Sequence, residues 1–148
     1  MSLTSLQGVK SIYFLGIAGQ LMSALACVAK SFGYEVTGSD ENAYPPATDY
    51  LDSHQIPYIL GHKPENIGPT DLVVLGPPVR EDNPELKAAL QKTLPLVSYP
   101  QLIRLLFPKA RHRLVVAGTH GKSTTTSLLG WILFETGKTY KLGSVDEG

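Results

Sequence analysis

The sequence of 148 residues predicts an α/β fold in which a doubly wound parallel sheet is followed by the first strand, phosphate-binding loop and helix of a second α/β domain. Two observations support this prediction. Strand signals alternate with single helix signals over residues 11–106, and strands joined by single helices pair in parallel through right-handed crossovers. Further along, an apolar run leads into Gly118-Thr119-His120-Gly121-Lys122-Ser123-Thr124, which has the character of a phosphate-binding loop.

The first part of the chain predicts a strand, a helix, a strand, a helix and a short strand, at Ser11–Leu15, Gln20–Phe32, Glu35–Gly38, Pro46–Ser53 and Tyr58–Leu60. The first helix follows from apolar residues that recur at helical spacing. Proline suits the first turn of the second helix, because an N–H there would have no intrahelical partner in any case.

The next part predicts a strand at Asp71–Leu75, a weak strand at Leu96–Val97 and a short helix at Gln101–Leu106. Between the two strands, Asn83 is expected to cap a helix that has proline at its first position. The side chains expected to face inward from this helix are Leu86, Ala89 and Leu90.

The phosphate-binding loop is predicted from its surroundings as much as from its residues. Arg113–Ala117 has the composition of a buried strand, and a helix begins near Ser123 with the apolar stripe Leu128, Leu129, Ile132 and Leu133. Gly118 and Gly121 let the backbone bend so that its N–H groups face anionic oxygens, and the helix N-terminus adds its positive dipole end.

Within this loop, Lys122 is expected to lie along the phosphates of a nucleoside triphosphate, and Ser123 to ligate Mg²⁺. The match to the usual pattern is partial, because the first glycine is replaced by Val116. For His120, a solvated loop histidine and a direct phosphate or substrate role both remain open.

A second candidate site is predicted at the carboxyl ends of the sheet strands, where parallel sheets bind their ligands. Its residues come from three loops: Gly16-Ile17-Ala18-Gly19, Ser39-Asp40 and Gly76. The first two resemble a dinucleotide fingerprint, yet that fingerprint needs glycine where the chain has Ala18 and Leu21. A phosphate-bearing nucleotide is therefore expected and NAD is not favoured. For Asp40, the alternative is that its side chain caps a helix or a turn.

Composition excludes several classes of protein. Thirteen basic and 13 acidic residues give a formal net charge of zero, so no nucleic-acid or membrane surface is expected. The single cysteine, Cys27, fits a reducing compartment and is read as a packed core thiol. The uncharged run Ile12–Ala29 has the length of a signal peptide or short membrane span, but glycines and helical spacing favour a strand, loop and helix instead.

Taken together, these segments resemble the Mur ligase family over about residues 9–137. The resemblance is carried by an ordered set of motifs, which read F-L-G-I-A-G at 14–19, G-Y-E-V-T-G-S-D at 33–40, G-H at 61–62, D-N-P-E at 82–85 and A-G-T-H-G-K-S-T at 117–124. The form of the last motif is also similar to the phosphate-binding loop of this family, which accounts for the missing first glycine.

Within the family, the chain is most similar to ligases that act on UDP-N-acetylmuramate. Leu21 and the segment 42–48 favour the ligase that attaches the tripeptide L-alanyl-γ-D-glutamyl-meso-diaminopimelate during peptidoglycan recycling. The alternative is the L-alanine-adding ligase of peptidoglycan biosynthesis. Two alternatives from other classes stay open: an NAD-binding oxidoreductase or sensor, and a non-catalytic nucleotide-binding module.

The resemblance implies a bacterial, cytoplasmic, three-domain enzyme of which this chain is the N-terminal part. Residues 1–109 would form a Rossmann-like domain for the UDP moiety, and residues 110–148 would begin the ATP-binding central domain. ATP and Mg²⁺ would convert the muramoyl carboxylate to an acyl phosphate, which the amine of the peptide then attacks to form an amide. The chain alone is expected to bind UDP-N-acetylmuramate without turnover. Residues 141–148 carry no structural signal.

Overall fold

The computed structural model describes residues 3–77, 79–110, 112 and 114–137. It divides into two compact units, Met1–Pro108 and Lys109–Gly148.

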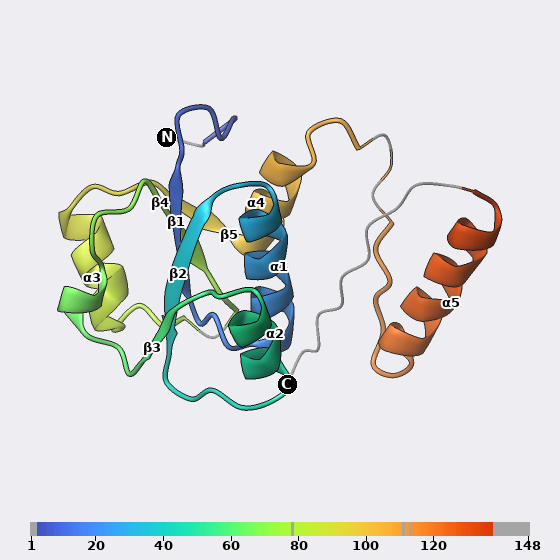
Figure 1. The fold of residues 1–148 in the computed structure, drawn as a ribbon, viewed down its shortest axis with the longest axis horizontal. Helices are drawn as coiled ribbons and strands as arrows, with labels where there is room; N and C mark the ends of the chain where they lie inside the picture. The colour runs from blue at the N-terminus through green and yellow to red at the C-terminus, as the bar shows by residue number, and fades with distance from the viewer. Residues whose placement is uncertain (1–2, 78, 111, 113, 138–148) are drawn as a thin grey trace. The chain divides into compact units, whose positions relative to one another are not determined.

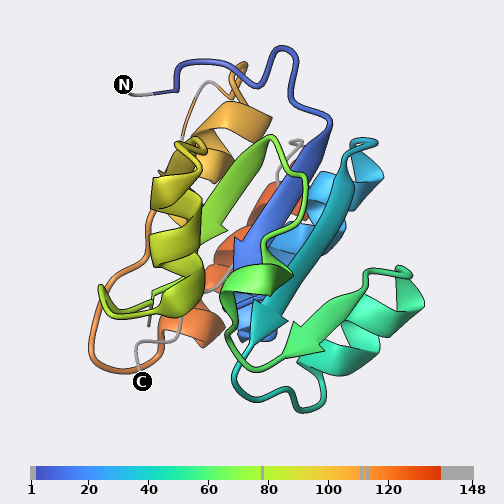
Figure 2. The same ribbon diagram turned by 90° about the vertical axis from the view of Figure 1, so that its left-hand side faces the viewer.

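The first unit is built on a five-stranded sheet with the strand order β3-β2-β1-β4-β5. Its strands are β1 (Ser11–Leu15), β2 (Glu35–Asp40), β3 (Tyr58–Leu60), β4 (Leu72–Leu75) and β5 (Leu96–Ser98). Each strand pairs in parallel with its neighbours, and the arrowheads of β1 to β4 point toward one end of the sheet in Figure 2. The predicted parallel, doubly wound sheet is therefore confirmed.

Helices cover both faces of this sheet (Figure 1). One face carries α1 (Gln20–Ser31), α2 (Ala47–Ser53) and α4 (Tyr99–Leu106), and the other carries α3 (Pro84–Gln91) and the short 3₁₀ helix η1 (Pro64–Asn66).

Side chains of the central strand alternate between the two cores, as a strand buried on both faces requires. Ile12 and Phe14 belong to the core beneath α1, α2 and α4. Tyr13 and Leu15 belong to the core beneath α3. All four side chains are at most 2% exposed, so the residues that follow β1 leave from a rigid strand.

Most predicted elements form within one or two residues of their expected bounds, with two informative differences. β2 continues past Gly38 to Asp40, because β3 pairs with its last three residues and supplies their hydrogen-bonding neighbours. In α3 the buried face is Glu85, Ala88 and Ala89, whereas Leu90 is 57% exposed. The inward-facing prediction is therefore wrong for Leu90, whereas Ala89 is buried and Leu86 is half-buried against the same core, as expected.

The second unit contains α5 (Lys122–Glu135), which begins one residue before the predicted position. Residues 114–118 have no regular secondary structure, although a buried strand was expected over Arg113–Ala117, and residue 113 lies outside the described residues. Leu114 is 64% and Val115 is 87% exposed. A strand needs a hydrogen-bonding neighbour, and none of the described residues pairs with this segment.

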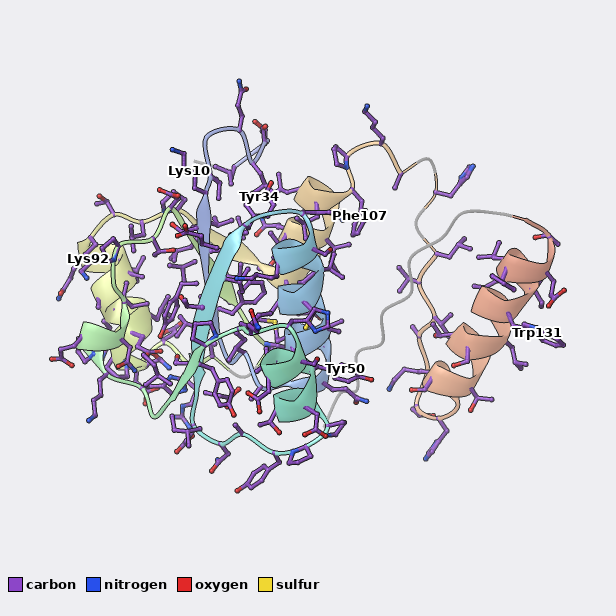
Figure 3. The ribbon with its side chains drawn as sticks, in the orientation of Figure 1. Lys10, Tyr34, Tyr50, Lys92, Phe107 and Trp131 are labelled. Atoms are coloured by element: carbon purple, nitrogen blue, oxygen red, sulfur yellow. The ribbon has the colours of Figure 1, made fainter. Side chains whose placement is uncertain are left out.

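The apolar stripe predicted on α5 is only partly buried. Leu129 and Leu133 are half-buried, whereas Leu128 and Ile132 are 54% and 55% exposed. Trp131 is exposed as well and projects from the helix in Figure 3. Apolar residues lie on all sides of this helix instead of on one face. Packing against one side therefore leaves the apolar residues on the other sides exposed to solvent.

Candidate functional site

The first candidate site lies where the chain order of the strands reverses. From β1 the chain continues through β2 to β3 on one side and then returns to β4 on the other side of β1. After β1 the chain continues to α1 on one face of the sheet, and after β4 it continues to α3 on the other face. Such switch points are where doubly wound sheets bind ligands.

Two glycines meet at this switch point. A Cβ atom built on Gly16 would lie 4.0 Å from the Cα of Gly76, and the Gly76 N–H donates to the carbonyl of Leu15 at 3.0 Å. Gly16 has a φ of 79°, which favours glycine, and a Cβ atom on Gly76 would lie 2.8 Å from the Leu15 oxygen. Both positions therefore require glycine, for different steric reasons.

The amides of the loop after β1 are mostly engaged within the protein. The N–H groups of Gly16 and Ile17 donate to the carbonyl of Ser39 at 2.9 and 3.0 Å. The N–H of Ala18 donates to the Asp40 carboxylate at 2.8 Å. Gly19 caps α1 without a side-chain hydrogen bond, so the first-turn amides of α1 are the free donors of this loop.

Ser39 and Asp40 therefore have internal roles that the sequence did not show. Ser39 is fully buried, and its hydroxyl points into the protein, to Glu85 and His62, instead of lining a ligand surface as expected. Asp40 is half-buried and also accepts from the N–H of Asn42 at 3.3 Å. The turn-cap reading of Asp40 thus describes its contacts in this structure.

A buried carboxylate lies behind this edge of the sheet. Glu85, in the first turn of α3, is 0% exposed. Its two oxygens accept hydrogen bonds from the side chains of four residues and from one backbone N–H, which belong to Tyr13, Ser39, His62, Asn66 and Lys63. The carboxylate is therefore fully satisfied, as a buried charge must be.

Tyr13 is held in its donor form by the same surroundings. Burial raises the pKa of the Tyr13 phenol well above its ordinary value, and the Glu85 carboxylate raises it further. The phenol oxygen lies 3.3 Å from Glu85 Oε1. The motif D-N-P-E at 82–85 contains Glu85, but the sequence gives no sign of its burial, since an acid in a helix is ordinarily exposed.

The second candidate site is the loop at the start of α5. Residues Thr119–Thr124 line an open hollow of about 300 Å³. Gly121 caps the helix with a φ of 76°, a conformation that favours glycine, and α5 begins at Lys122. The expected loop residues are thus brought together around one concavity at a helix N-terminus, which is an arrangement suited to phosphate.

Comparison with known proteins decides the family. A model described as "Mur ligase family, catalytic domain" matches residues 11–110, which include every strand of the sheet. The chain belongs to the Mur ligase family. The matched region ends before the loop at Thr119–Thr124, so the family match rests on the first unit.

Named relatives support the same assignment. The chain is 42% identical over 138 residues to the UDP-N-acetylmuramate–L-alanyl-gamma-D-glutamyl-meso-2,6-diaminoheptandioate ligase of Escherichia coli K12, covering 93% of this chain and 30% of that protein. It is 44% identical over 131 residues to the UDP-N-acetylmuramate–L-alanine ligase of Aromatoleum aromaticum, covering 87% and 27%.

A solved structure agrees with these relatives. The crystal structure of a murein peptide ligase from Psychrobacter arcticus matches with a TM-score of 0.79 and 38% identity, covering 86% of this chain and 27% of that one. The chain therefore spans less than a third of the length of each of these three Mur ligases.

Three further observations concern the described part of this Mur ligase chain. No helix there is long and apolar enough to cross a membrane, and the run Ile12–Ala29 forms β1, the glycine loop and most of α1. No group of three or more His, Cys, Asp or Glu side chains gathers there as a metal site. Cys27 is buried, as expected for a core thiol.

Proposed function

We propose that this chain supplies the UDP-sugar-binding sheet and the ATP-phosphate loop of a ligase that joins UDP-N-acetylmuramate to the tripeptide L-alanyl-γ-D-glutamyl-meso-diaminopimelate. Residues 1–109 would hold the UDP moiety, and residues 110–148 would begin the ATP-binding domain. The 42% identical relative from Escherichia coli, which is named for this reaction, supports the proposal.

The observation that carries the proposal is the paired-glycine switch point at the carboxyl end of the sheet. Gly16 and Gly76 let the loops after β1 and β4 approach each other at this point. The first-turn amides of α1 provide free donors and a positive dipole end for a diphosphate. The Gly16–Gly19 loop and Gly76 would contact the ligand, whereas Ser39 and Asp40 would support the loop from behind.

At the second site, the proposed roles fall on residues of the hollow itself. Lys122, which is half-buried, would place its ammonium along the phosphates of ATP and balance the charge on the transferred phosphoryl group. Ser123 is exposed beside it, and its hydroxyl would be one oxygen ligand of Mg²⁺. Held there, the cation would supply positive charge that offsets the negative charge of the phosphates.

A second acceptor is supported by a specific comparison. The relative from Aromatoleum aromaticum is 44% identical and is named for L-alanine. Because the sheet and the loop would hold the UDP-sugar and ATP in both cases, the described residues serve either reaction. A ligase assay on the whole protein with L-alanine and with the tripeptide as competing acceptors separates the two.

Calorimetry on the 148-residue chain tests the proposed ligand class. We expect UDP-N-acetylmuramate to bind more tightly than NADH, with UDP alone retaining much of the affinity. Tighter binding of NADH would instead support the oxidoreductase or sensor reading. In a phosphate-release assay with ATP, we expect no substrate-dependent turnover, because the chain spans 30% of the Escherichia coli relative.

A further inference from the structure

Two separated motifs of the chain meet in one hydrogen-bonded pair. The Nδ1 atom of His62 lies 2.9 Å from Oε2 of Glu85, although the two residues are 23 positions apart. His62 follows the short strand β3, whereas Glu85 lies in the first turn of α3. Neither residue has a role in the site proposed above.

The pair fixes one of the two ring nitrogens of the histidine as a donor. An ionised carboxylate can only accept hydrogen bonds, so the Nδ1 atom of His62 must carry the proton. In the neutral ring, Nε2 then keeps its lone pair and is an acceptor. Because Glu85 is 0% exposed while the His62 side chain is 21% exposed, the histidine is the member of this pair that reaches the surface.

Several contacts keep the histidine in one place. Asn66 donates both to the Glu85 carboxylate and to the carbonyl of Gly61, the residue before His62, so it fixes the turn that carries the ring. Ser39 Oγ lies 3.3 Å from Nδ1 of His62. The ring is therefore held on the same side by a carboxylate and a hydroxyl.

Ser39 also locates the pair at the switch point. Its hydroxyl donates to Glu85, while its carbonyl accepts from the amides of Gly16 and Ile17 at 2.9 and 3.0 Å. One residue thus connects the buried carboxylate to the loop proposed to meet the nucleotide. The helix N-terminus beneath Glu85 adds a favourable dipole for its negative charge.

We propose that Glu85 is a positioning residue for the UDP-sugar site, which holds His62 in its Nδ1–H form so that Nε2 accepts a hydrogen bond from a hydroxyl group of the ligand. This inference rests on the proposed function. The hydroxyl belongs either to the ribose or to the amino sugar, and the chemistry is the same for both.

A thermodynamic cycle tests the proposal on the 148-residue chain. Binding of UDP and of UDP-N-acetylmuramate is measured by calorimetry for wild type, Glu85→Gln, His62→Gln and the double variant. We expect each single variant to weaken binding about tenfold. In the His62→Gln background, Glu85→Gln should weaken binding by less than about a further twofold, because Glu85 acts on the ligand only by positioning the His62 ring.

Comparing the two ligands shows whether the hydroxyl belongs to the ribose or to the amino sugar. An equal loss with UDP and UDP-N-acetylmuramate assigns the hydroxyl to the ribose, and a loss with UDP-N-acetylmuramate alone assigns it to the amino sugar. Additive losses in the cycle would mean a merely structural Glu85 and would overturn the proposal. Glu81→Gln, which changes an exposed acid four residues earlier, is the matched control and should leave both affinities unchanged.

A spectroscopic measurement needs no folded variant. Long-range proton–nitrogen NMR spectra of wild type should show the neutral form of His62 as the Nδ1–H tautomer, and an Nε2–H tautomer would overturn the proposal even if Glu85→Gln fails to fold. Failure of wild type to bind either UDP ligand, with the Nδ1–H tautomer present, would instead refute the proposed function on which the inference rests.

Discussion

Asp40 and Ala18 join the end of β2 to the glycine loop through one short hydrogen bond. The Ala18 N–H donates to Asp40 Oδ2 at 2.8 Å, across 22 residues of sequence. The other oxygen of the same carboxylate accepts from the N–H of Asn42 at 3.3 Å. One side chain therefore sets both the loop after β1 and the turn after β2, so the loop is shaped before any ligand arrives.

Replacing Asp40 by alanine should loosen this loop. The change removes the acceptor of two backbone N–H groups, so we expect a loss of about 1–2 kcal/mol in the free energy of unfolding. Urea denaturation measures the loss, and amide hydrogen exchange at Ala18 should become faster. Glu41→Ala, at the neighbouring exposed acid, is the control and should stay within about 0.5 kcal/mol of wild type. Unchanged exchange at Ala18 would contradict this role.

Gly38 should tolerate no larger residue. A Cβ atom there would lie 2.4 Å from the Phe14 carbonyl oxygen and 2.8 Å from Ile17 Cδ1, so β2 and the loop after β1 would have to separate. We expect Gly38→Ala to lower the free energy of unfolding by about 3 kcal/mol or more. Gly68 has nothing within 4 Å of its added Cβ, so Gly68→Ala should change stability by less than about 1 kcal/mol. Equal effects of the two substitutions in thermal unfolding would refute this steric reading.

Asp71 should make the fold sensitive to acid. Its carboxylate accepts from the backbone N–H groups of Lys10 and Ser11 at 2.9 Å and from the Ser11 hydroxyl at 3.0 Å, and these bonds lower the pKa of Asp71. Because the folded pKa is the lower one, the stabilisation is present above the unfolded pKa of about 4 and is lost as the pH falls through the folded value.

Urea midpoints measured from neutral pH down through this range test the effect. Asp71→Asn should be less stable than wild type at neutral pH, and the difference should shrink in acid. Ser11→Ala leaves the two backbone donors in place and should therefore show a smaller loss than Asp71→Asn. A difference between wild type and Asp71→Asn that does not depend on pH would contradict the linkage.

Lys122 should carry much of the affinity for ATP at the second site. Lys122→Met keeps the length of the side chain but removes the charge, so we expect binding of Mg-ATP to the chain to weaken by about tenfold or more. Fluorescence or calorimetric titration measures this loss. Lys109→Met alters an exposed lysine of the same unit that does not line the hollow, and it should bind Mg-ATP as wild type does. Equal binding by both variants would refute the role of Lys122.

Local patterns in the sequence predicted most of the first unit, because the signals that specify its elements lie within each element. The Asn83 side chain accepts from the N–H groups of Glu85 and Leu86, as its position before a proline predicts. The strand at Ser11–Leu15 was likewise recognisable from five consecutive residues. The strand expected before Gly118 does not form. A strand depends on a hydrogen-bonding neighbour, and the local sequence does not contain that neighbour.

The amino-acid order by itself determined the alternation of strands and helices, the glycines at the turns and the motifs of the Mur ligase family, because each is a short-range property of the chain. Only the tertiary structure decided the strand order, the inward direction of the Ser39 side chain and the burial of Glu85. The Ser39–Glu85 contact spans 46 residues, and a charge is placed in the interior only when distant donors are folded around it.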